Sequence, residues 1–141
     1  MRPSMRLEAP PHLFLHADHA PDLMTINPVS LRANATVAEA VTLLTQRGFS
    51  AAPVIDEAGR PIGVLSQVDL LIHERRGKNA EEMIVRDLMT PVVYSVSPDT
   101  SAASVVEQML TLRVRRLFVV DHDGVLIGVI STHDILRHLQ A

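Results

Sequence analysis

Two stretches of the chain repeat apolar residues with the period of an α-helix. In the first, apolar side chains recur at i, i+3, i+4 and i+7, at Val37, Ala40, Val41 and Leu44. In the second, the same four places hold Ala102, Val105, Val106 and Met109. This spacing predicts two helices that each bury one face.

A pair of short apolar runs follows each predicted helix. Residues 53–55 and 117–120 are too short for helices and rich in β-branched residues, so they are predicted to be strands. Turns with Gly at residues 56–59 and 121–124 lead into second strands at 62–65 and 126–130. With short strands near residues 29–31 and 93–96, and helices starting near Ser66 and Ser131, each unit is strand, helix, strand, strand, helix.

Polar residues indicate where the two amphipathic helices start. Thr36 with Glu39 three residues later has the spacing of a capping box, which satisfies free N–H groups at a helix start. Pro98 and Asp99 are expected to start the second helix in a similar way. Met24 and Met89 are expected to fill the core under the first strands.

The similarity of the two units reflects an internal duplication. Asp-Leu-Met-Thr at residues 22–25 recurs at 87–90, an offset of 65, and 16 of the 50 positions in 22–71 are identical in 87–136 without a gap. A unit of about 50 residues closes too little core to be stable alone, so the two copies should fold together.

The repeat boundaries predict the domain organisation. We expect an α+β protein with repeats of β-α-β-β-α at residues 21–74 and 84–141 and a mixed-charge connector at 75–83. Residues 1–20, with three Pro and little periodicity, are expected to be a tail or an arm.

Composition excludes several function classes. One Tyr, three Phe and no Trp are too few rings for single-stranded nucleic-acid binding, and a net charge of −3 gives no basic field for a phosphate backbone. The chain has no Cys, and its N-terminal apolar run at residues 13–15 is too short for a signal sequence or a membrane span. We therefore expect a soluble, cytoplasmic protein with no nucleic-acid partner and no membrane insertion.

The repeated residues resemble a known family. Asp-Leu-Met-Thr, a helix, and then Pro-Val-Ile-Asp-x-x-Gly-x-x-Ile-Gly-Val-Leu-Ser-x-x-Asp-Leu-Leu, present twice, are similar to a tandem pair of cystathionine β-synthase (CBS) domains. The resemblance covers residues 22 to about 138. Two positions depart from the family pattern: Phe118, where Pro is usual and is kept as Pro53, and residues 50–52, where basic residues often precede that Pro.

The resemblance implies a fold and a function. A Bateman module has two CBS motifs whose sheets face each other as a pseudo-symmetric pair, with clefts that bind AMP, ADP, ATP or S-adenosylmethionine. Such modules usually regulate an enzyme or a transporter. The stand-alone bacterial kind, which this chain resembles, commonly forms a homodimer, and the aliphatic residues of the second helices support this expectation: Leu70, Leu71, Ile72, Ile135, Leu136 and Leu139.

The first candidate site residues lie where each second strand meets its helix. Free N–H groups and the helix dipole at such a start favour an anion, and Asp69 or Asp134 can accept ribose hydroxyls. The alternative is that the S-x-x-D spacing only caps the helix. The resemblance implies ribose and phosphate contacts at Ser66, Asp69, Ser131, Thr132 and Asp134, and adds Thr25, Ala51 and Thr90 as further ligand-binding candidates.

Three arginines precede the strand predicted at residues 117–120 of the second copy. Of Arg113, Arg115 and Arg116, one or two should point into the cleft between the repeats, where guanidinium groups bind phosphate; the alternative is a charged, solvated sheet edge. The first copy has Ser50 and Ala51 in place of Arg115 and Arg116, so at most one cleft should be strongly cationic. The resemblance implies that the carboxylate and the basic residues of one cleft can come from opposite repeats, so we expect the tighter site to combine Ser66 and Asp69 with Arg115 or Arg116.

Other chemistry finds little support in the sequence. His12, His16 and His19 could share a helical face, but without Cys and among several Pro residues we expect no metal site. No nucleophile elbow, P-loop, H-E-x-x-H or dinucleotide-binding glycine motif occurs, so no catalysis is expected. We therefore expect a regulatory module that binds adenine nucleotides without requiring a cofactor and signals to a partner protein. The alternative is a constitutive dimerisation or scaffold module with empty clefts.

Overall fold

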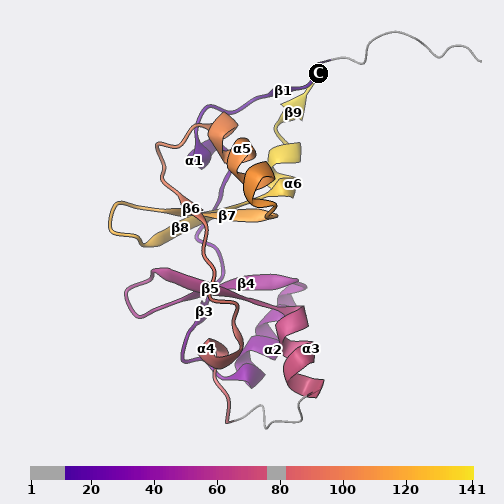
Figure 1. Cartoon of the computed structure of the whole chain (residues 1–141), viewed down its shortest axis with the longest axis vertical. Helices are drawn as coiled ribbons and strands as arrows, with labels where there is room; N and C mark the ends of the chain where they lie inside the picture. The colour runs from indigo at the N-terminus through magenta and orange to yellow at the C-terminus, as the bar shows by residue number, and fades with distance from the viewer. Residues whose placement is uncertain (1–11, 76–81) are drawn as a thin grey trace, which may run out of the picture.

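The structure of the chain is a computed structural model that describes residues 12–75 and 82–141. The expected tail, residues 1–20, and the expected connector, residues 75–83, lie partly outside the described residues. The described chain forms two similar halves stacked along the long axis of the molecule (Figure 1).

The first half is a three-stranded sheet covered on its outer face by two helices. The strand order is β3-β4-β5, with β3 parallel to β4 and β4 antiparallel to β5. The strands are β3 (Leu31–Arg32), β4 (Ala51–Ile55) and β5 (Pro61–Ser66). The helices are α2 (Val37–Arg47) and α3 (Gln67–Arg75).

The second half repeats this plan with one strand more. Its sheet has the order β2-β8-β7-β6. The strands are β2 (Thr25–Ile26), β6 (Ser95–Val96), β7 (Arg116–Val120) and β8 (Leu126–Ser131), and the helices are α5 (Ala102–Leu112) and α6 (Thr132–Leu136). The two sheets face each other with all helices outside, which confirms the α+β fold with facing sheets (Figure 1).

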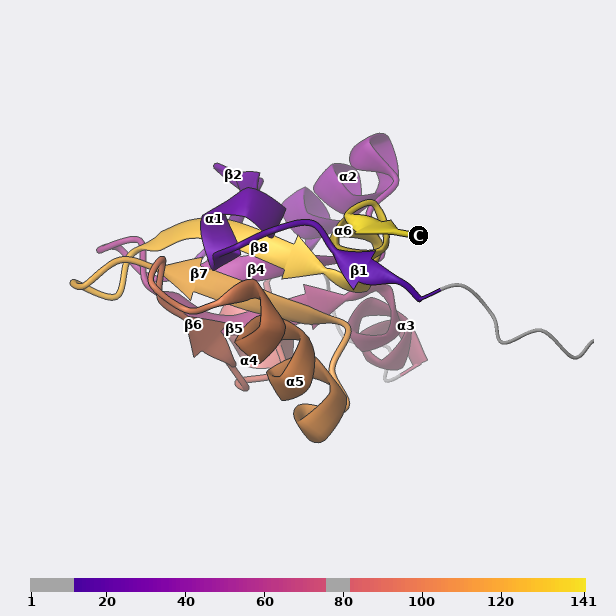
Figure 2. The ribbon, with the colours of Figure 1, turned by 90° about the horizontal axis from the view of Figure 1, so that it is seen from above.

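Each half is completed by a short helix that belongs to the other repeat in sequence. Helix α1 (Ala20–Leu23) lies beside β8 and α5, and its Leu23 is buried in the core of the second half (Figure 2). Helix α4 (Val85–Leu88) packs on α3, and its Val85 is buried in the core of the first half. Burying one such apolar side chain contributes about 1.5–3 kcal/mol, so the exchange holds the halves together.

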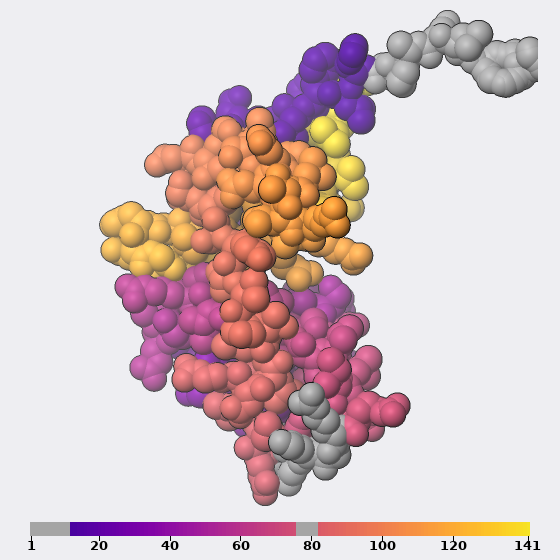
Figure 3. All heavy atoms as spheres, in the orientation of Figure 1, coloured from indigo at the N-terminus to yellow at the C-terminus, as the bar shows by residue number. Residues whose placement is uncertain are grey.

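The threonine that ends each Asp-Leu-Met-Thr motif extends this exchange into the sheets. Thr25 pairs antiparallel with Val129 of β8, and Thr90 pairs antiparallel with Val64 of β5 through two backbone hydrogen bonds of 3.0 and 2.8 Å. The chain after α4 then crosses the waist between the two halves to reach β6 (Figure 3).

The methionines of the two motifs pack against the cores, as expected, and each lies over a glycine of the opposite repeat. Met24 contacts the position of Gly128 in β8, and Met89 contacts that of Gly63 in β5. A Cβ at Gly63 would lie 2.7 Å from the carbonyl oxygen of Thr90 and 2.8 Å from the sulfur of Met89. The glycine therefore makes room for the exchanged segment.

The cap of α2 agrees with the sequence prediction, whereas the cap of α5 differs from it. The Thr36 hydroxyl accepts a hydrogen bond of 3.0 Å from the Glu39 N–H, as predicted. Before α5 the cap is Ser101, whose hydroxyl accepts from the Ser104 N–H, so the prediction of Pro98 and Asp99 was wrong. Ser101 immediately precedes the first residue of α5, and its hydroxyl stands three residues before the N–H that it accepts from.

The segment before α1 forms an extended arm. Its strand β1 (Phe14–Leu15) pairs with β9 (Leu139–Gln140) at the far end of the second half (Figure 1). The backbone of His16 donates to the carbonyl of His138 at 2.8 Å. The arm is not helical, so the expectation that His12, His16 and His19 share a helical face was wrong.

We expect Gly63→Ala to lower the free energy of unfolding by about 1–3 kcal/mol, because the new Cβ would overlap the Thr90 backbone. Gly128→Ala is the matched variant; the three atoms nearest its Cβ all belong to the side chain of Met24, which can move more easily than backbone, so a smaller loss is expected. Urea unfolding of both variants measures the difference. An equal or larger loss in Gly128→Ala would contradict the proposed role of the Thr90 backbone.

Candidate functional site

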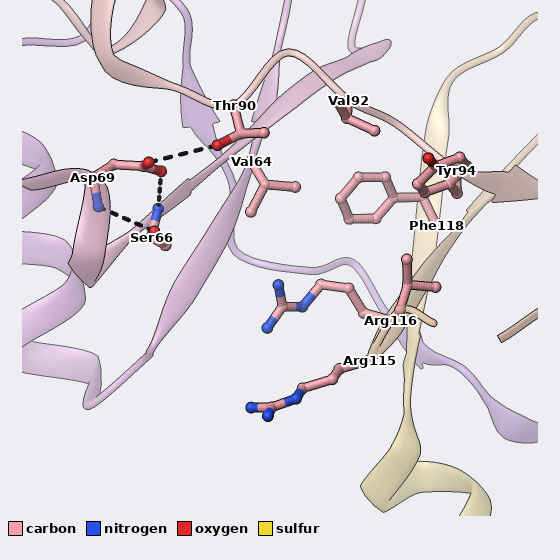
Figure 4. Close-up of a pocket in the computed structure, with 10 residues that line it drawn as sticks. Val64, Ser66, Asp69, Thr90, Val92, Tyr94, Arg115, Arg116 and Phe118 are labelled. Carbon is pink, nitrogen blue, oxygen red and sulfur yellow. Dashed lines mark hydrogen bonds between the residues drawn. The ribbon is translucent and has the colours of Figure 1, made fainter. Parts of the chain in front are cut away.

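A cleft of about 310 Å³ opens between the two sheets, and we call it cleft 1. Its walls come from the end of β5, the start of α3, the segment that crosses between the halves, and the start of β7 (Figure 4). The lining residues are Val64, Ser66, Asp69, Thr90, Val92, Tyr94, Val114, Arg115, Arg116 and Phe118. Cleft 1 therefore brings together five residues that the sequence singled out: Ser66, Asp69, Thr90, Arg115 and Arg116.

The acidic end of cleft 1 is a helix cap. The Asp69 N–H donates to the Ser66 hydroxyl at 3.1 Å, and the Ser66 N–H donates to Oδ2 of Asp69 at 2.8 Å. The other carboxylate oxygen, Oδ1, accepts a long hydrogen bond of 3.5 Å from the Thr90 hydroxyl. A carboxylate oxygen has two lone pairs, so Asp69 caps α3 and retains capacity for a further donor.

The basic end of cleft 1 carries two guanidinium groups. The side chains of Arg115 and Arg116 extend side by side from β7 into the space between the sheets (Figure 4). In the described parts of the chain the ion pairs are His122–Asp123 and Asp134–Arg137, so neither arginine is paired with a carboxylate. Burial lowers the pKa of the Arg116 guanidinium, and the charge of Arg115 lowers this pKa further. A bound anion would compensate both charges.

Apolar side chains lie between the two polar ends. Phe118 projects toward Val64, while Val92 and Tyr94 border the same space from the crossing segment (Figure 4). Phe118 is 2% exposed, whereas Val92 and Tyr94 are 45% and 41% exposed. Sequence analysis did not single out Val92 or Tyr94, since the crossing segment was expected only as a short strand. The one signal available was that Tyr94 is the single Tyr of the chain.

A second cleft of about 390 Å³ opens between the same two sheets on the side away from cleft 1, and we call it cleft 2. It is lined by Thr25, Asn27, Pro28, Val29, Phe49, Ala51, Ala52, Pro53, Arg116, Val129, Ser131 and Asp134. Cleft 2 thus combines four other predicted residues: Thr25, Ala51, Ser131 and Asp134.

The carboxylate of cleft 2 is more fully engaged than that of cleft 1. Asp134 is 5% exposed, and its Oδ2 accepts from the Ser131 N–H at 2.8 Å and from the Ser131 hydroxyl at 3.0 Å. Its Oδ1 pairs with the guanidinium of Arg137. The position equivalent to Arg137 in the first repeat is Ile72, so Asp69 has no such partner. Asp134 is therefore less available to a ligand than Asp69.

Two of the three arginines line the clefts. Arg115 and Arg116 line cleft 1, and Arg116 also lines cleft 2. Arg113 lines neither cleft; it ends α5 in a left-handed conformation with φ of 57°, as Gly48 ends α2 with φ of 65°. Its backbone conformation is thus set by the helix end.

The helix starts offer fewer N–H groups to an anion than expected. The Gln67 N–H at the start of α3 donates to the Ser50 carbonyl at 2.9 Å. The Thr132 N–H at the start of α6 donates to the Arg115 carbonyl at 3.0 Å, and Thr132 lines neither cleft. An anion in either cleft would therefore depend on arginine side chains more than on helix N–H groups.

Two further findings on the described residues concern metal binding and membrane spans. In residues 12–75 and 82–141, no three His, Asp or Glu side chains are grouped so that they could hold a metal ion. Every helix within these ranges is too short or too polar to cross a membrane.

Comparison with known proteins identifies the family. The family model described as CBS domain matches residues 20–75 and 85–141. The solved structure of CBSX2 in complex with AMP is similar, with a TM-score of 0.72 and 32% identity over 84% of this chain and 93% of that chain. The cytosolic domain of the Mg²⁺ channel MgtE in complex with ATP gives a TM-score of 0.72 and 32% identity over 85% of this chain and 48% of that chain.

A relative known by sequence is MK0525 of Methanopyrus kandleri, 32% identical over 117 residues that cover 82% of this chain. The chain spans 57% of the length of that relative. The family match covers both halves of the molecule, as do the duplicated motif and the two facing sheets. The chain therefore belongs to the CBS domain family and carries a tandem pair of CBS domains, a Bateman module.

Proposed function

We propose that the chain is a non-catalytic regulatory module that binds an adenine nucleotide in cleft 1. The observation that carries this proposal is the arrangement of cleft 1, where a carboxylate from one repeat faces two guanidinium groups from the other, neither of which pairs with a carboxylate among the described residues. A phosphate supplies the charge that the guanidinium groups lack. The similarity to CBSX2 in complex with AMP and to the MgtE domain in complex with ATP supports this ligand class.

The three parts of the cleft suggest how the ligand is held. The base would pack among Val64, Val92 and Phe118, which are apolar. The ribose hydroxyls would donate to Oδ1 of Asp69, and the phosphates would accept from Arg115 and Arg116. AMP, ADP and ATP differ in the number of phosphates that meet these two arginines, and S-adenosylmethionine remains a possible ligand through its adenosine group.

Regulation would follow from the position of the ligand between the repeats. A nucleotide that contacts Asp69 of the first half and Arg116 of the second favours the arrangement in which both can reach it. Such a shift changes the surface that a partner protein meets, and linkage requires the partner to change nucleotide affinity in return. The partner would be an enzyme or a transporter.

We expect Asp69→Ala and Asp134→Ala to differ in AMP binding. Each variant removes the carboxylate of a helix cap, which should lower the free energy of unfolding by about 0.5–2 kcal/mol. Asp69→Ala should in addition weaken AMP binding because a ribose acceptor is lost, whereas Asp134→Ala should hardly change AMP affinity. Arg115→Ala together with Arg116→Ala should lower AMP affinity at least about tenfold, since charge-assisted hydrogen bonds contribute about 1.5–3 kcal/mol each.

Isothermal titration calorimetry with AMP and urea unfolding of each variant make these measurements. Loss of the tight site in Asp134→Ala with an unchanged site in Asp69→Ala would refute the assignment of cleft 1. The absence of binding heat with AMP, ADP, ATP and S-adenosylmethionine would favour the alternative, a constitutive dimerisation or scaffold module.

We further propose that the working unit is a homodimer. Several apolar side chains on the outer helices are exposed, among them Leu71 (64%), Leu110 (74%) and Leu136 (62%). Three residues that the sequence assigned to this surface belong elsewhere: Leu70 packs on the core of the first half, Ile135 is buried at 8% exposure, and Leu139 lies in strand β9, where it pairs with Leu15 of β1. The surface left for a second copy is therefore smaller than expected.

Sedimentation velocity at micromolar concentration should show a species of twice the 15.5 kDa chain. Leu71→Lys combined with Leu136→Lys should shift it to the monomer, because charge in a buried interface is strongly unfavourable. Leu13→Lys, on the exposed arm, is the matched control and should leave the dimer intact. A wild-type chain that sediments as a 15.5 kDa species would contradict the dimer.

A further inference from the structure

We propose that Arg116 couples the two clefts, so that an anionic nucleotide in one cleft weakens the binding of an anionic nucleotide in the other. The inference rests on the proposed function and concerns its regulation. Among the described lining residues, Arg116 is the one shared by clefts 1 and 2.

The two clefts depend on Arg116 to different degrees. Cleft 1 also has the guanidinium of Arg115, whereas the described lining of cleft 2 includes no Lys or Arg besides Arg116. The duplication explains this difference, because the residue equivalent to Arg116 in the first repeat is Ala51, which has no charge to offer. A phosphate in cleft 2 therefore draws on a group that cleft 1 also uses.

One guanidinium that serves two clefts makes their anions compete. When a phosphate in cleft 1 engages Arg116, fewer of its N–H donors remain for cleft 2. If both phosphates approach Arg116 together, their negative charges also repel each other across the narrow space between the sheets. Both effects have the same sign, and both vanish for a ligand without phosphate.

The coupling is reciprocal and specific to charge. Binding in cleft 2 must weaken cleft 1 by the same factor as binding in cleft 1 weakens cleft 2. Cleft 1, with two guanidinium groups, fills first. The chain then responds to low AMP through cleft 1 and to high AMP through cleft 2, which widens the concentration range over which it responds.

The test measures AMP binding to cleft 2 in two situations: when cleft 1 is filled and when cleft 1 is blocked. Val92 lines cleft 1 alone and is 45% exposed, so Val92→Trp can obstruct cleft 1 without repacking a core. Backbone amide shifts of Val64 and Ser66 report cleft 1, and those of Val129 and Ser131 report cleft 2, during titration with AMP and with adenosine.

In Val92→Trp we expect the AMP concentration that half-saturates cleft 2 to fall at least about tenfold relative to wild type, the equivalent of about one charge-assisted hydrogen bond. Adenosine should half-saturate cleft 2 at the same concentration in both proteins. In an Arg116→Ala background, Val92→Trp should leave the AMP affinity of cleft 2 unchanged. Asp69→Ala, which weakens cleft 1 without lining cleft 2, is a second way to empty cleft 1 and should act like Val92→Trp.

If AMP half-saturates cleft 2 at the same concentration in wild type, Val92→Trp and Asp69→Ala, the coupling is overturned while the proposed function stands. A tenfold change that persists in the Arg116→Ala background would also overturn it, since the coupling would then run through other residues. If AMP moves the amides of neither cleft in the wild-type protein, the proposed function itself fails, and the coupling with it.

Discussion

The reciprocal exchange of two segments, residues 20–25 and 85–90, is the constraint on which the rest of the molecule depends. Each segment leaves its own repeat, buries a side chain in the opposite core and pairs its threonine with the last strand of the opposite sheet. Leu23 and Val85 are each no more than 1% exposed in these foreign cores. Neither core is complete without the other repeat, so the sheets are held face to face at a fixed separation.

The separation of the sheets determines what the clefts can do. Each cleft lies between the halves and takes its lining from both repeats, so neither half has a complete site. In cleft 1 the carboxylate and the guanidinium groups come from different repeats, whereas in cleft 2 Asp134 and Arg116 both come from the second. The duplication supplies the symmetric frame, and a few substitutions differentiate the two clefts. Arg137 neutralises the cap carboxylate of the second repeat, whereas its equivalent in the first repeat, Ile72, has no charge. Likewise Arg116 supplies a cation from the second repeat, whereas its equivalent, Ala51, does not.

Much of this arrangement could be predicted from the sequence because it depends on local spacing. The helical stripes, the hairpin turns and the Ser66–Asp69 box follow from periods and capping rules that act within a few residues. The cap at Ser101 was missed because Pro98 and Asp99 are also good helix starters, and the selection among them depends on the turn that precedes α5.

The parts that could not be predicted depend on contacts between distant residues. No local rule indicates that Arg116 reaches both clefts, or that Tyr94 borders one, since both facts depend on the spacing of two sheets. Nor does spacing distinguish Asp69 from Asp134, whose environments differ through a third residue. The resemblance to CBS domains supplied the cross-repeat arrangement that periodicity could not.

The exchange of short helices also sets the order in which the halves can fold during synthesis. The core of the first half is built from one continuous stretch, residues 31–89, whereas the core of the second joins residues 20–24 to residues 96–135. Chains emerge from the ribosome N-terminus first. Every residue of the first core is therefore available once Met89 has emerged, whereas Leu23 on α1 meets the last of its partners only when Ile135 has been made. A nascent chain of this protein therefore exposes the apolar face of α1 for most of its synthesis.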